Sequence, residues 1–252
     1  MRMNDQPNNT EIIKICLLAG RIMLQSGAET YRVEDTMMRM ASSLGINSSQ
    51  SYVTPTGIIF SLGETEQTNF VRILERSTDL YKVTLVNSVS RKLTGGELSV
   101  NEAAEQLKEI EAQTHTYAIA VQIAAASLAS GCFTIMFQGG WSDFLPSCVV
   151  GGVGFSSMVY FHQIVKIRFF AEFLASFIIG LLAFISIYLH IGTELDKIII
   201  GSVMPLVPGL LITNAVRDLM AGHLVSGLSK GAEAFLTAFA IGAGIAIVFS
   251  FI

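Results

Sequence analysis

The pattern of hydrophobic and polar positions divides the chain near residue 116. Before this point, stretches with apolar residues at helical spacing surround a stretch rich in β-branched and aromatic residues. The helices are expected at residues 10–25, about 27–44, 79–92 and 99–111, and the two or three strands at 51–62 and 68–74. This order predicts a small α+β domain over residues 1–116, which is long enough to bury its own core.

Two helix starts in this domain carry a capping-box pattern. Ser26 is followed three residues later by Glu29, and Ser99 is followed in the same way by Glu102. In a capping box the hydroxyl accepts a hydrogen bond from the third backbone N–H, and the carboxylate accepts one from the N-cap N–H. We therefore expect both pairs to close the first turns of their helices.

After residue 116 the chain has five apolar runs. They cover Tyr117–Phe137, Phe144–Phe161, Phe169–Leu189, Ile198–Thr213 and Ala234–Ile252. About 20 apolar residues suffice for a helix to cross the hydrocarbon core of a bilayer. Small residues spaced four apart, such as Gly227 and Gly231, favour close packing between helices. The fold class predicted is thus an α-helical integral membrane protein, with five transmembrane helices over residues 117–252 after the small α+β domain.

The fourth run is interrupted. Pro205, Pro208 and Gly209 lie inside it, and each proline removes a backbone donor and clashes with the preceding turn. Beyond the interruption the chain runs directly into a cation and an anion, Arg217 and Asp218. A broken helix beside ionisable groups is typical of the wall of a transport pathway.

The composition agrees with a membrane protein. Mean hydropathy is +0.55, 14% of the residues are charged, and residues 1–116 hold 11 of the 16 Lys and Arg and 14 of the 20 Asp and Glu. The net charge of −4 offers no basic surface for nucleic acid. Cys16, Cys132 and Cys148 have no paired spacing and the histidines none that suits a metal, so we expect no disulfide, metal or other cofactor. The polar first residues predict no signal peptide.

Basic residues in the short connections set the expected orientation. Lys166 and Arg168 lie between the second and third runs, and Arg217 and Lys230 lie between the fourth and fifth. The positive-inside rule then places residues 1–116 in the cytoplasm and the C-terminus outside. With an odd number of spans, a similar bundle fused after this one would enter the membrane inverted, as in the repeats of secondary transporters. The chain has one such bundle, so it resembles half of a transporter.

Four sets of residues resemble the threonine/serine exporter family. They are Gly27-Ala28-Glu29-Thr30-Tyr31-Arg32-Val33-Glu34, Pro55-Thr56-Gly57-Ile58-Ile59-Phe60, Val207-Pro208-Gly209 with Asn214-Ala215-Val216-Arg217-Asp218, and Gly222-His223 with Ser226-Gly227-Leu228. Their order along nearly the whole chain is far more specific than any one fragment. The resemblance implies a bacterial inner-membrane exporter of small hydrophilic metabolites. It implies amino acids such as threonine or serine, or dicarboxylates such as succinate, as substrates.

The resemblance also bears on partners. Some members of the family are single chains of about ten spans, whereas others place the second half in a separate small membrane protein. With five spans, this chain resembles the larger subunit of the two-part exporters associated with succinate. We therefore expect the lipid bilayer and a small second membrane subunit as partners, and we expect the protein to form a homo- or hetero-oligomer. The lack of a phosphate-binding loop favours a proton or substrate gradient over ATP as the energy source.

The candidate substrate-binding residues lie at and after the interruption. Arg217 could hold a substrate carboxylate through its planar donor fork, with Asn214 as a hydrogen-bond partner and Pro208 and Gly209 at the break itself. Asp218, four residues after Asn214 and on the same helical face, could carry the coupling proton. Each has a simpler reading as well, since Arg217 and Asp218 could form a helix-end ion pair and Asn214 could cap a free carbonyl.

Three further residues are candidates for coupling or gating. Lys230 and Glu233 stand three apart at the mouth of the last span, where a structural salt bridge is the simpler reading. His223 follows the interrupted run and can change its charge near neutral pH.

A motif in the N-terminal domain comprises Gly27, Glu29, Thr30, Arg32, Glu34, Pro55 and Gly57. We expect it to gate the cytoplasmic mouth or bind the metabolite, because no nucleophile elbow, phosphate loop or histidine-based zinc pattern points to an enzyme. The competing interpretation is a membrane-anchored metabolite sensor with a cytoplasmic ligand-binding domain. A signalling anchor would not need Pro205, Pro208 and a cluster of ionisable groups, so export is preferred.

Overall fold

The computed structural model describes residues 8–64, 66–165 and 168–251. The chain forms two compact units: the first combines Met1–Thr116 with Thr213–Gly231, and the second combines Tyr117–Ile212 with Ala232–Ile252. We call residues 213–231 the returning segment, because they belong to the same unit as the N-terminal part of the chain. Lys166, used above for orientation, lies outside the described residues, as does the side chain of Arg168.

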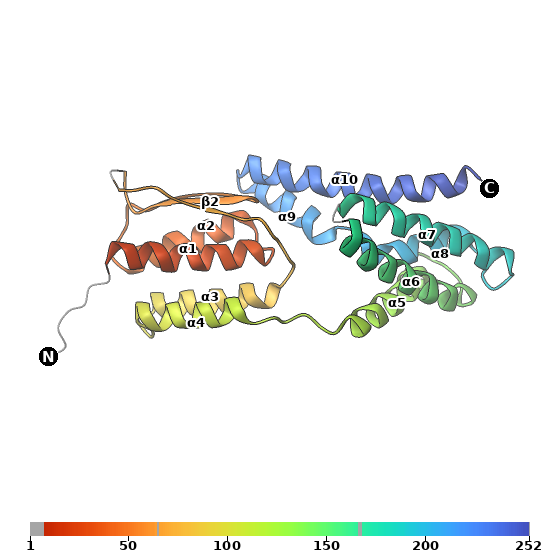
Figure 1. Ribbon diagram of the computed structural model, residues 1–252, viewed down its shortest axis with the longest axis horizontal. Helices are drawn as coiled ribbons and strands as arrows, with labels where there is room; N and C mark the ends of the chain where they lie inside the picture. The colour runs from red at the N-terminus through yellow and green to blue at the C-terminus, as the bar shows by residue number, and fades with distance from the viewer. Residues whose placement is uncertain (1–7, 65, 166–167, 252) are drawn as a thin grey trace. The chain divides into compact units, whose positions relative to one another are not determined.

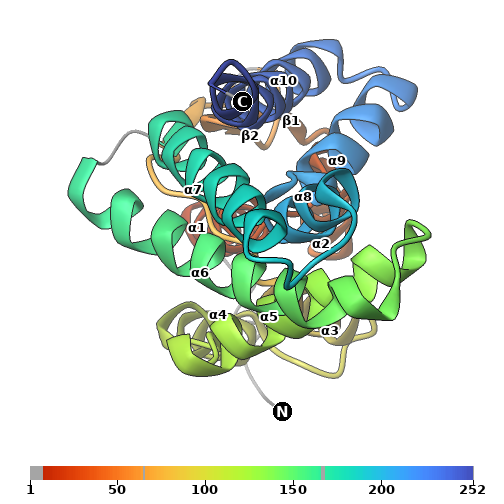
Figure 2. The ribbon, with the colours of Figure 1, turned by 90° about the vertical axis from the view of Figure 1, so that its right-hand side faces the viewer.

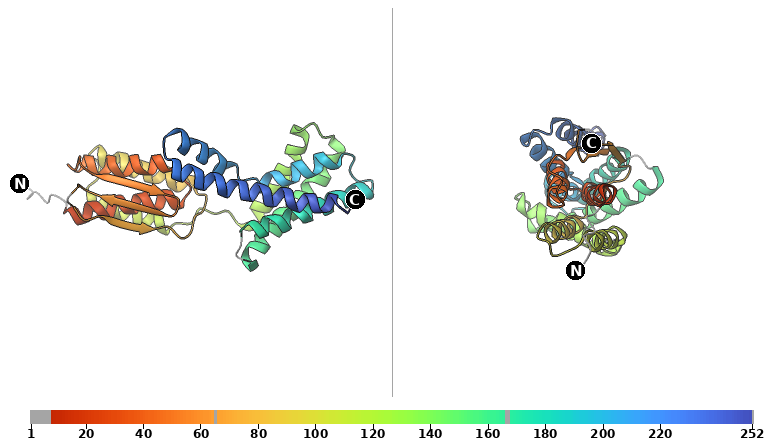
Figure 3. Two further views of the ribbon diagram at one scale, coloured as in Figure 1. Left: turned by 90° about the horizontal axis from the view of Figure 1, so that it is seen from above. Right: turned by 90° about the vertical axis from the view of Figure 1, so that its left-hand side faces the viewer.

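The N-terminal part of the first unit is built in three layers (Figure 1). Its elements are α1 (Asn9–Gln25), α2 (Thr30–Ser43), β1 (Gln50–Thr54), β2 (Gly57–Ser61), β3 (Asn69–Arg72), α3 (Leu80–Thr94) and α4 (Val100–Ala112). The strands form an antiparallel sheet in the order β1-β2-β3. Helices α1 and α2 cover one face of this sheet, with the strands running alongside them, and α3 and α4 form the third layer (Figures 1 and 3). The order of helices and strands predicted from the sequence is confirmed.

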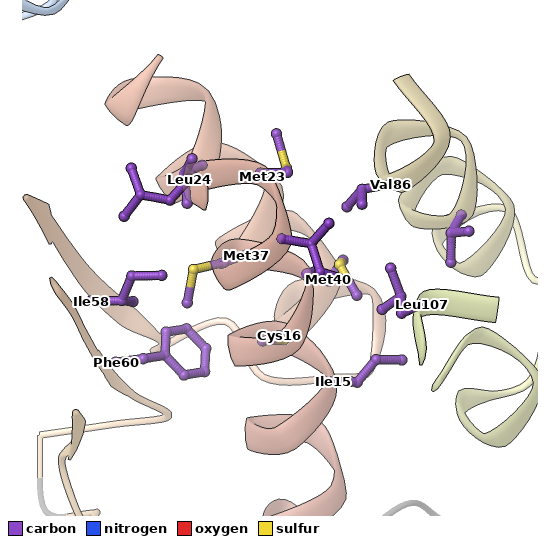
Figure 4. Packing of buried hydrophobic residues seen from close by; sticks show 14 of the residues in the cluster. Ile15, Cys16, Met23, Leu24, Met37, Met40, Ile58, Phe60, Val86 and Leu107 are labelled. Carbon is purple, nitrogen blue, oxygen red and sulfur yellow. The ribbon is translucent and has the colours of Figure 1, made fainter. Parts of the chain in front are cut away.

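The core of this unit lies around the middle layer (Figure 4). Met37 and Met40 of α2 are fully buried, and Ile58 and Phe60 point from β2 toward the helices. The period of two along β2 explains this arrangement, because the intervening residue on the strand is exposed. Cys16 of α1 is buried in the same core, and burial raises the pKa of its thiol to about 12, so the thiol stays protonated at neutral pH.

One predicted capping box is present and the other is not. At the start of α4, the Ser99 N–H donates to Glu102 Oε2 at 2.8 Å and the Glu102 N–H donates to Ser99 Oγ at 3.3 Å. The box predicted from Ser26 and Glu29 is wrong. Glu29 is itself the N-cap residue of α2 and makes no side-chain cap bond. Its carboxylate is instead held by two arginines, as described below.

The second unit contains the apolar helices. They are α5 (Ile119–Met136), α6 (Trp141–Val165), α7 (Arg168–Tyr188), α8 (Leu195–Val203) with the 3-10 turn η1 (Met204–Leu206), and the greater part of α10 (Leu224–Phe249). Within the described residues, four helices are long and apolar enough to cross a membrane. A fifth candidate is the bent pair made by Leu195–Leu206 and α9 (Gly209–Met220). The helical character of this part is confirmed, and the five predicted spans correspond to four candidate spans, or to five if the bent pair forms one span.

The interruption of the fourth run occurs where the prolines predict it. Regular α-helix stops at Val203, Pro205 lies in η1, and helix resumes at Gly209 directly after Pro208. Proline lacks a backbone donor and disfavours helical conformation at the residue before it, which explains why Val207 is extended. The fourth run is therefore two helical pieces and not one straight span.

Helices α5 to α8 pack closely on one another (Figure 2). A Cβ added to Gly151 of α6 or Gly201 of α8 would collide with a hydroxyl side chain of α5, so glycine permits these contacts. Asp143, in the first turn of α6, is fully buried and fixes the connection between α7 and α8. Its carboxylate accepts hydrogen bonds from the Thr193 N–H at 2.5 Å, from Thr193 Oγ1 at 2.8 Å and from the Glu194 N–H at 3.3 Å.

Candidate functional site

The candidate site is the turn formed by residues 27–30, between α1 and α2. Gly27 adopts a positive φ of 88°, its N–H donates to the Leu24 carbonyl, and the Ala28 N–H donates to the Met23 carbonyl at 3.0 Å. These two bonds form a Schellman motif, in which a glycine ends the helix because it carries no Cβ to clash in the left-handed conformation. Thr30 then begins α2 directly.

Asp218 of the returning segment caps the start of α2. Its Oδ1 accepts the Thr30 N–H at 2.9 Å, and its Oδ2 accepts Thr30 Oγ1 at 2.9 Å. The first N–H groups of a helix have no partner within the helix and attract negative charge. Asp218, which is fully buried, thus does for α2 what the predicted Ser26–Glu29 box does not.

Lys230 supplies the counter-charge for Asp218. Its Nζ donates to Asp218 Oδ2 at 2.7 Å, to Thr30 Oγ1 at 3.1 Å and to the Ala28 carbonyl at 3.5 Å. The side chain of Lys230 is 5% exposed and that of Asp218 is 0% exposed. The spacing of three residues between Lys230 and Glu233 favours a salt bridge between them, whereas the structure pairs Lys230 with Asp218. A buried ammonium requires a buried anion and further acceptors, and Asp218 with the turn provides both.

The rest of the turn is also held by the returning segment. Asn214 Nδ2 donates to the Gly27 carbonyl at 2.9 Å. Arg217 NH1 lies 2.5 Å from Glu29 Oε1, and Arg32 Nε lies 3.4 Å from Glu29 Oε2. The alternative pairing of Arg217 with Asp218 is therefore not the one the structure adopts. Asn214 and Asp218 do share the buried face of α9 that their spacing predicted.

A second set of contacts joins the returning segment to β1. Ser226 Oγ donates to the Val53 carbonyl at 3.1 Å, and the Val53 N–H donates to Glu34 Oε1 at 2.8 Å. His223 Nδ1 lies 3.7 Å from the same Glu34 oxygen. Burial raises the pKa of Glu34 above the usual value, and the charge of Asp218 adds to this, whereas the Val53 N–H and His223 oppose it.

Two residues of the N-terminal motif have a role in the sheet. Pro55 lies in the two-residue connection that joins Thr54 to Gly57 in the β1–β2 hairpin. A Cβ on Gly57 would lie 2.8 Å from Phe70 Cε2, so glycine allows this aromatic ring to lie over β2. The β1–β2 hairpin thus explains why Pro55 and Gly57 occur at these positions.

The predicted site residues divide between the two units. In the first unit, predicted residues of the returning segment contact residues of the N-terminal motif. The former are Asn214, Arg217, Asp218, His223 and Lys230, and the latter are Gly27, Glu29, Thr30, Arg32 and Glu34. Pro208, Gly209 and Glu233 belong to the second unit. No pattern in the sequence predicts that Thr30 and Lys230 share Asp218, because contacts between residues so distant along the chain leave no periodic signal.

Apolar helices of membrane-spanning length, with a bent pair among them, are features of a multi-pass membrane protein, and broken helices of this kind occur in secondary transporters. Residues 14–252 match the family described as "Putative threonine/serine exporter", and the chain belongs to this family. The resemblance seen in the four sets of residues is confirmed. No solved structure shows a significant match.

The chain is also similar to three individual proteins. It is 24% identical to the "Probable succinate transporter subunit YjjP" of Escherichia coli over 93% of this chain and 92% of that protein. It is 25% identical to the protein of the same name from Klebsiella aerogenes, over 96% and 94%. It is 23% identical to the "Probable threonine/serine exporter" of Mycobacterium tuberculosis over 93% of this chain but 45% of that protein. The chain therefore spans less than half of one relative and nearly all of the other two.

Proposed function

We propose that this protein is a subunit of a secondary exporter of small hydrophilic metabolites in the bacterial inner membrane. The substrates are amino acids such as threonine and serine, or dicarboxylates such as succinate. Support comes from the family match over residues 14–252 and from the names of the three relatives. In this proposal residues 1–116 form a cytoplasmic domain that the returning segment joins, the remainder of residues 117–252 forms the membrane domain, and the C-terminus lies outside.

We further propose that transport requires a second, small membrane subunit. The E. coli relative is named as a subunit, and this chain covers 92% of it. The M. tuberculosis relative is more than twice as long as the matched region, so it has room for a further part. A separate second chain would supply that part here.

The observation that carries the proposed mechanism is the buried Asp218–Lys230 pair on Thr30. A proton that binds Asp218 removes the charge that holds Lys230 and weakens the cap on α2 at the same time. Proton binding to Asp218 is thereby linked to the contact between the returning segment and the 27–30 turn. Asp218 is in this proposal the coupling carboxylate, with Lys230 and His223 in gating roles.

Efflux measurements test this proposal. Labelled succinate, threonine and serine are followed in cells that lack native exporters, with the chain expressed alone and with its small partner. We expect efflux to need both chains and to collapse when the proton gradient is dissipated. Asp218→Asn should abolish the dependence on the gradient, whereas Asp143→Asn, which alters another buried, threonine-bound aspartate, should keep it. Normal gradient-driven efflux by Asp218→Asn at normal protein levels would exclude the coupling role.

A further inference from the structure

Glu29 has an unusual relation to its two cationic partners. Its own side chain is 7% exposed, whereas those of Arg217 and Arg32 are 53% and 40% exposed. An ion pair that only decorates a surface usually exposes both partners. Here the anion is hidden in the protein while both cations reach solvent.

The charges around Glu29 do not balance within this group. Among the described residues, the ion pairs of Arg217 and of Arg32 are both with Glu29. One carboxylate thus faces two guanidinium groups. The neighbouring Asp218 is paired with Lys230, and the Glu34 carboxylate is bound by the Val53 N–H and lies beside His223, so neither of these carboxylates is paired with the two arginines. An anion from solution would give these arginines a second partner.

The geometry also leaves donors for a second carboxylate. Glu29 contacts NH1 of Arg217 and Nε of Arg32, which is one nitrogen of each guanidinium. A guanidinium carries five N–H groups over three nitrogens and matches a carboxylate with two parallel bonds. Each exposed arginine can therefore offer a fork to a small carboxylate, most strongly once Glu29 has moved away.

We propose that Glu29 is an internal competitor that occupies Arg217 and Arg32 until the carboxylate of a substrate displaces it. This inference rests on the proposed function and specifies its substrate class: small molecules with a free carboxylate, which both amino acids and dicarboxylates carry. The two arginines recognise that carboxylate. Glu29 determines how readily it binds, because the incoming anion must replace an existing ion pair.

Equilibrium binding to the purified full chain in detergent tests the competition without requiring transport. Labelled succinate and labelled threonine are titrated onto the wild type and onto Glu29→Gln, which keeps the shape of the side chain but removes its charge. Because the competing ion pair is lost, Glu29→Gln should bind at least one of these ligands roughly 2- to 5-fold more tightly. Succinamide, which has no carboxylate, should gain nothing.

Two control variants make the result specific. Glu111→Gln breaks an ion pair whose two partners are both exposed, Glu111 with Arg21 at 2.7 Å, and should leave binding unchanged. Combining Glu29→Gln with Arg217→Gln should remove the gain. The inference is wrong if folded Glu29→Gln binds no carboxylate more tightly than the wild type does. This includes the case in which neither the wild type nor Glu29→Gln binds a carboxylate. Tighter binding without any efflux would overturn the proposed function and leave the competitor role standing.

Discussion

Asp143 and Asp218 are bound in the same way, although they belong to different units. Each carboxylate accepts the N–H of a threonine with one oxygen and the hydroxyl of that threonine with the other, Thr193 for Asp143 and Thr30 for Asp218. The third donor differs. It is a backbone N–H, that of Glu194, for Asp143, and the ammonium of Lys230 for Asp218.

The third donor therefore distinguishes a contact that is independent of a partner's charge from one that depends on it. A backbone N–H is neutral and fixed in place, so the third bond of Asp143 to the connection before α8 does not depend on a second charged side chain. The ammonium of Lys230 carries a full charge on a long side chain and depends on the charge of Asp218. The same pair of bonds to threonine can therefore serve a rigid connection in one unit and a charge-dependent contact in the other.

The largest effect is expected from Lys230→Met. It leaves Asp218 buried without a counter-charge, which should lower the free energy of unfolding by about 3–5 kcal/mol. Adding Asp218→Asn should recover much of this loss. Chemical denaturation of the detergent-solubilised full chain measures both, with Lys108→Met, at an exposed position on α4, as the control. A loss no larger than that of the control would mean that the pair does not hold the turn.

Neutralising each aspartate tests the comparison directly. Asp143→Asn keeps an acceptor for the Thr193 N–H and should cost about 1–2 kcal/mol. Asp218→Asn leaves the ammonium of Lys230 buried without its anion, so its cost should approach about 3 kcal/mol. The same denaturation measurement compares them. Equal losses would show that the third donor does not distinguish the two sites.

A glycine in the segment that each aspartate binds gives a further test. Gly27→Ala forces a Cβ into a backbone conformation with a φ of 88° and should cost about 1–2 kcal/mol. At Gly192, a new Cβ would lie 2.6 Å from Cδ1 of the buried Ile198 and 3.3 Å from Asp143 Oδ1, so Gly192→Ala should cost about 1–3 kcal/mol through overpacking. Thermal unfolding measures both losses, and a loss near zero for Gly27→Ala would contradict the role of the 27–30 turn.

The smallest effect concerns pH. The raised pKa of Glu34 means that the folded state binds its proton more tightly than the unfolded state. Glu34→Gln should therefore gain stability over the wild type at pH 7.5, and this gain should shrink as the pH falls toward the ordinary value of 4.5. Because the charge of Asp218 contributes to the shift, Asp218→Asn should reduce the pH dependence and Asp143→Asn should not. A gain that is constant with pH would rule out titration of Glu34.

Sequence reasoning succeeded where the signal is local. The Ser99–Glu102 box, the helix break at Pro205 and Pro208, and the shared face of Asn214 and Asp218 follow from spacings of three or four residues. It failed for Ser26 and Glu29, although their spacing is that of a capping box, because a distant arginine attracts the Glu29 carboxylate and a distant aspartate caps the helix. Contacts of this kind depend on the tertiary fold, which periodicity does not report.

The bond between Thr30 and Asp218 joins residues 188 positions apart. At elongation rates of about 5–20 residues per second, the ribosome needs roughly 10 to 40 s to travel between them. During that interval the start of α2 has left the ribosome without its aspartate, and the apolar helices α5 to α8 are synthesised. The first unit is therefore among the earliest parts of the chain to be made and among the last to be completed.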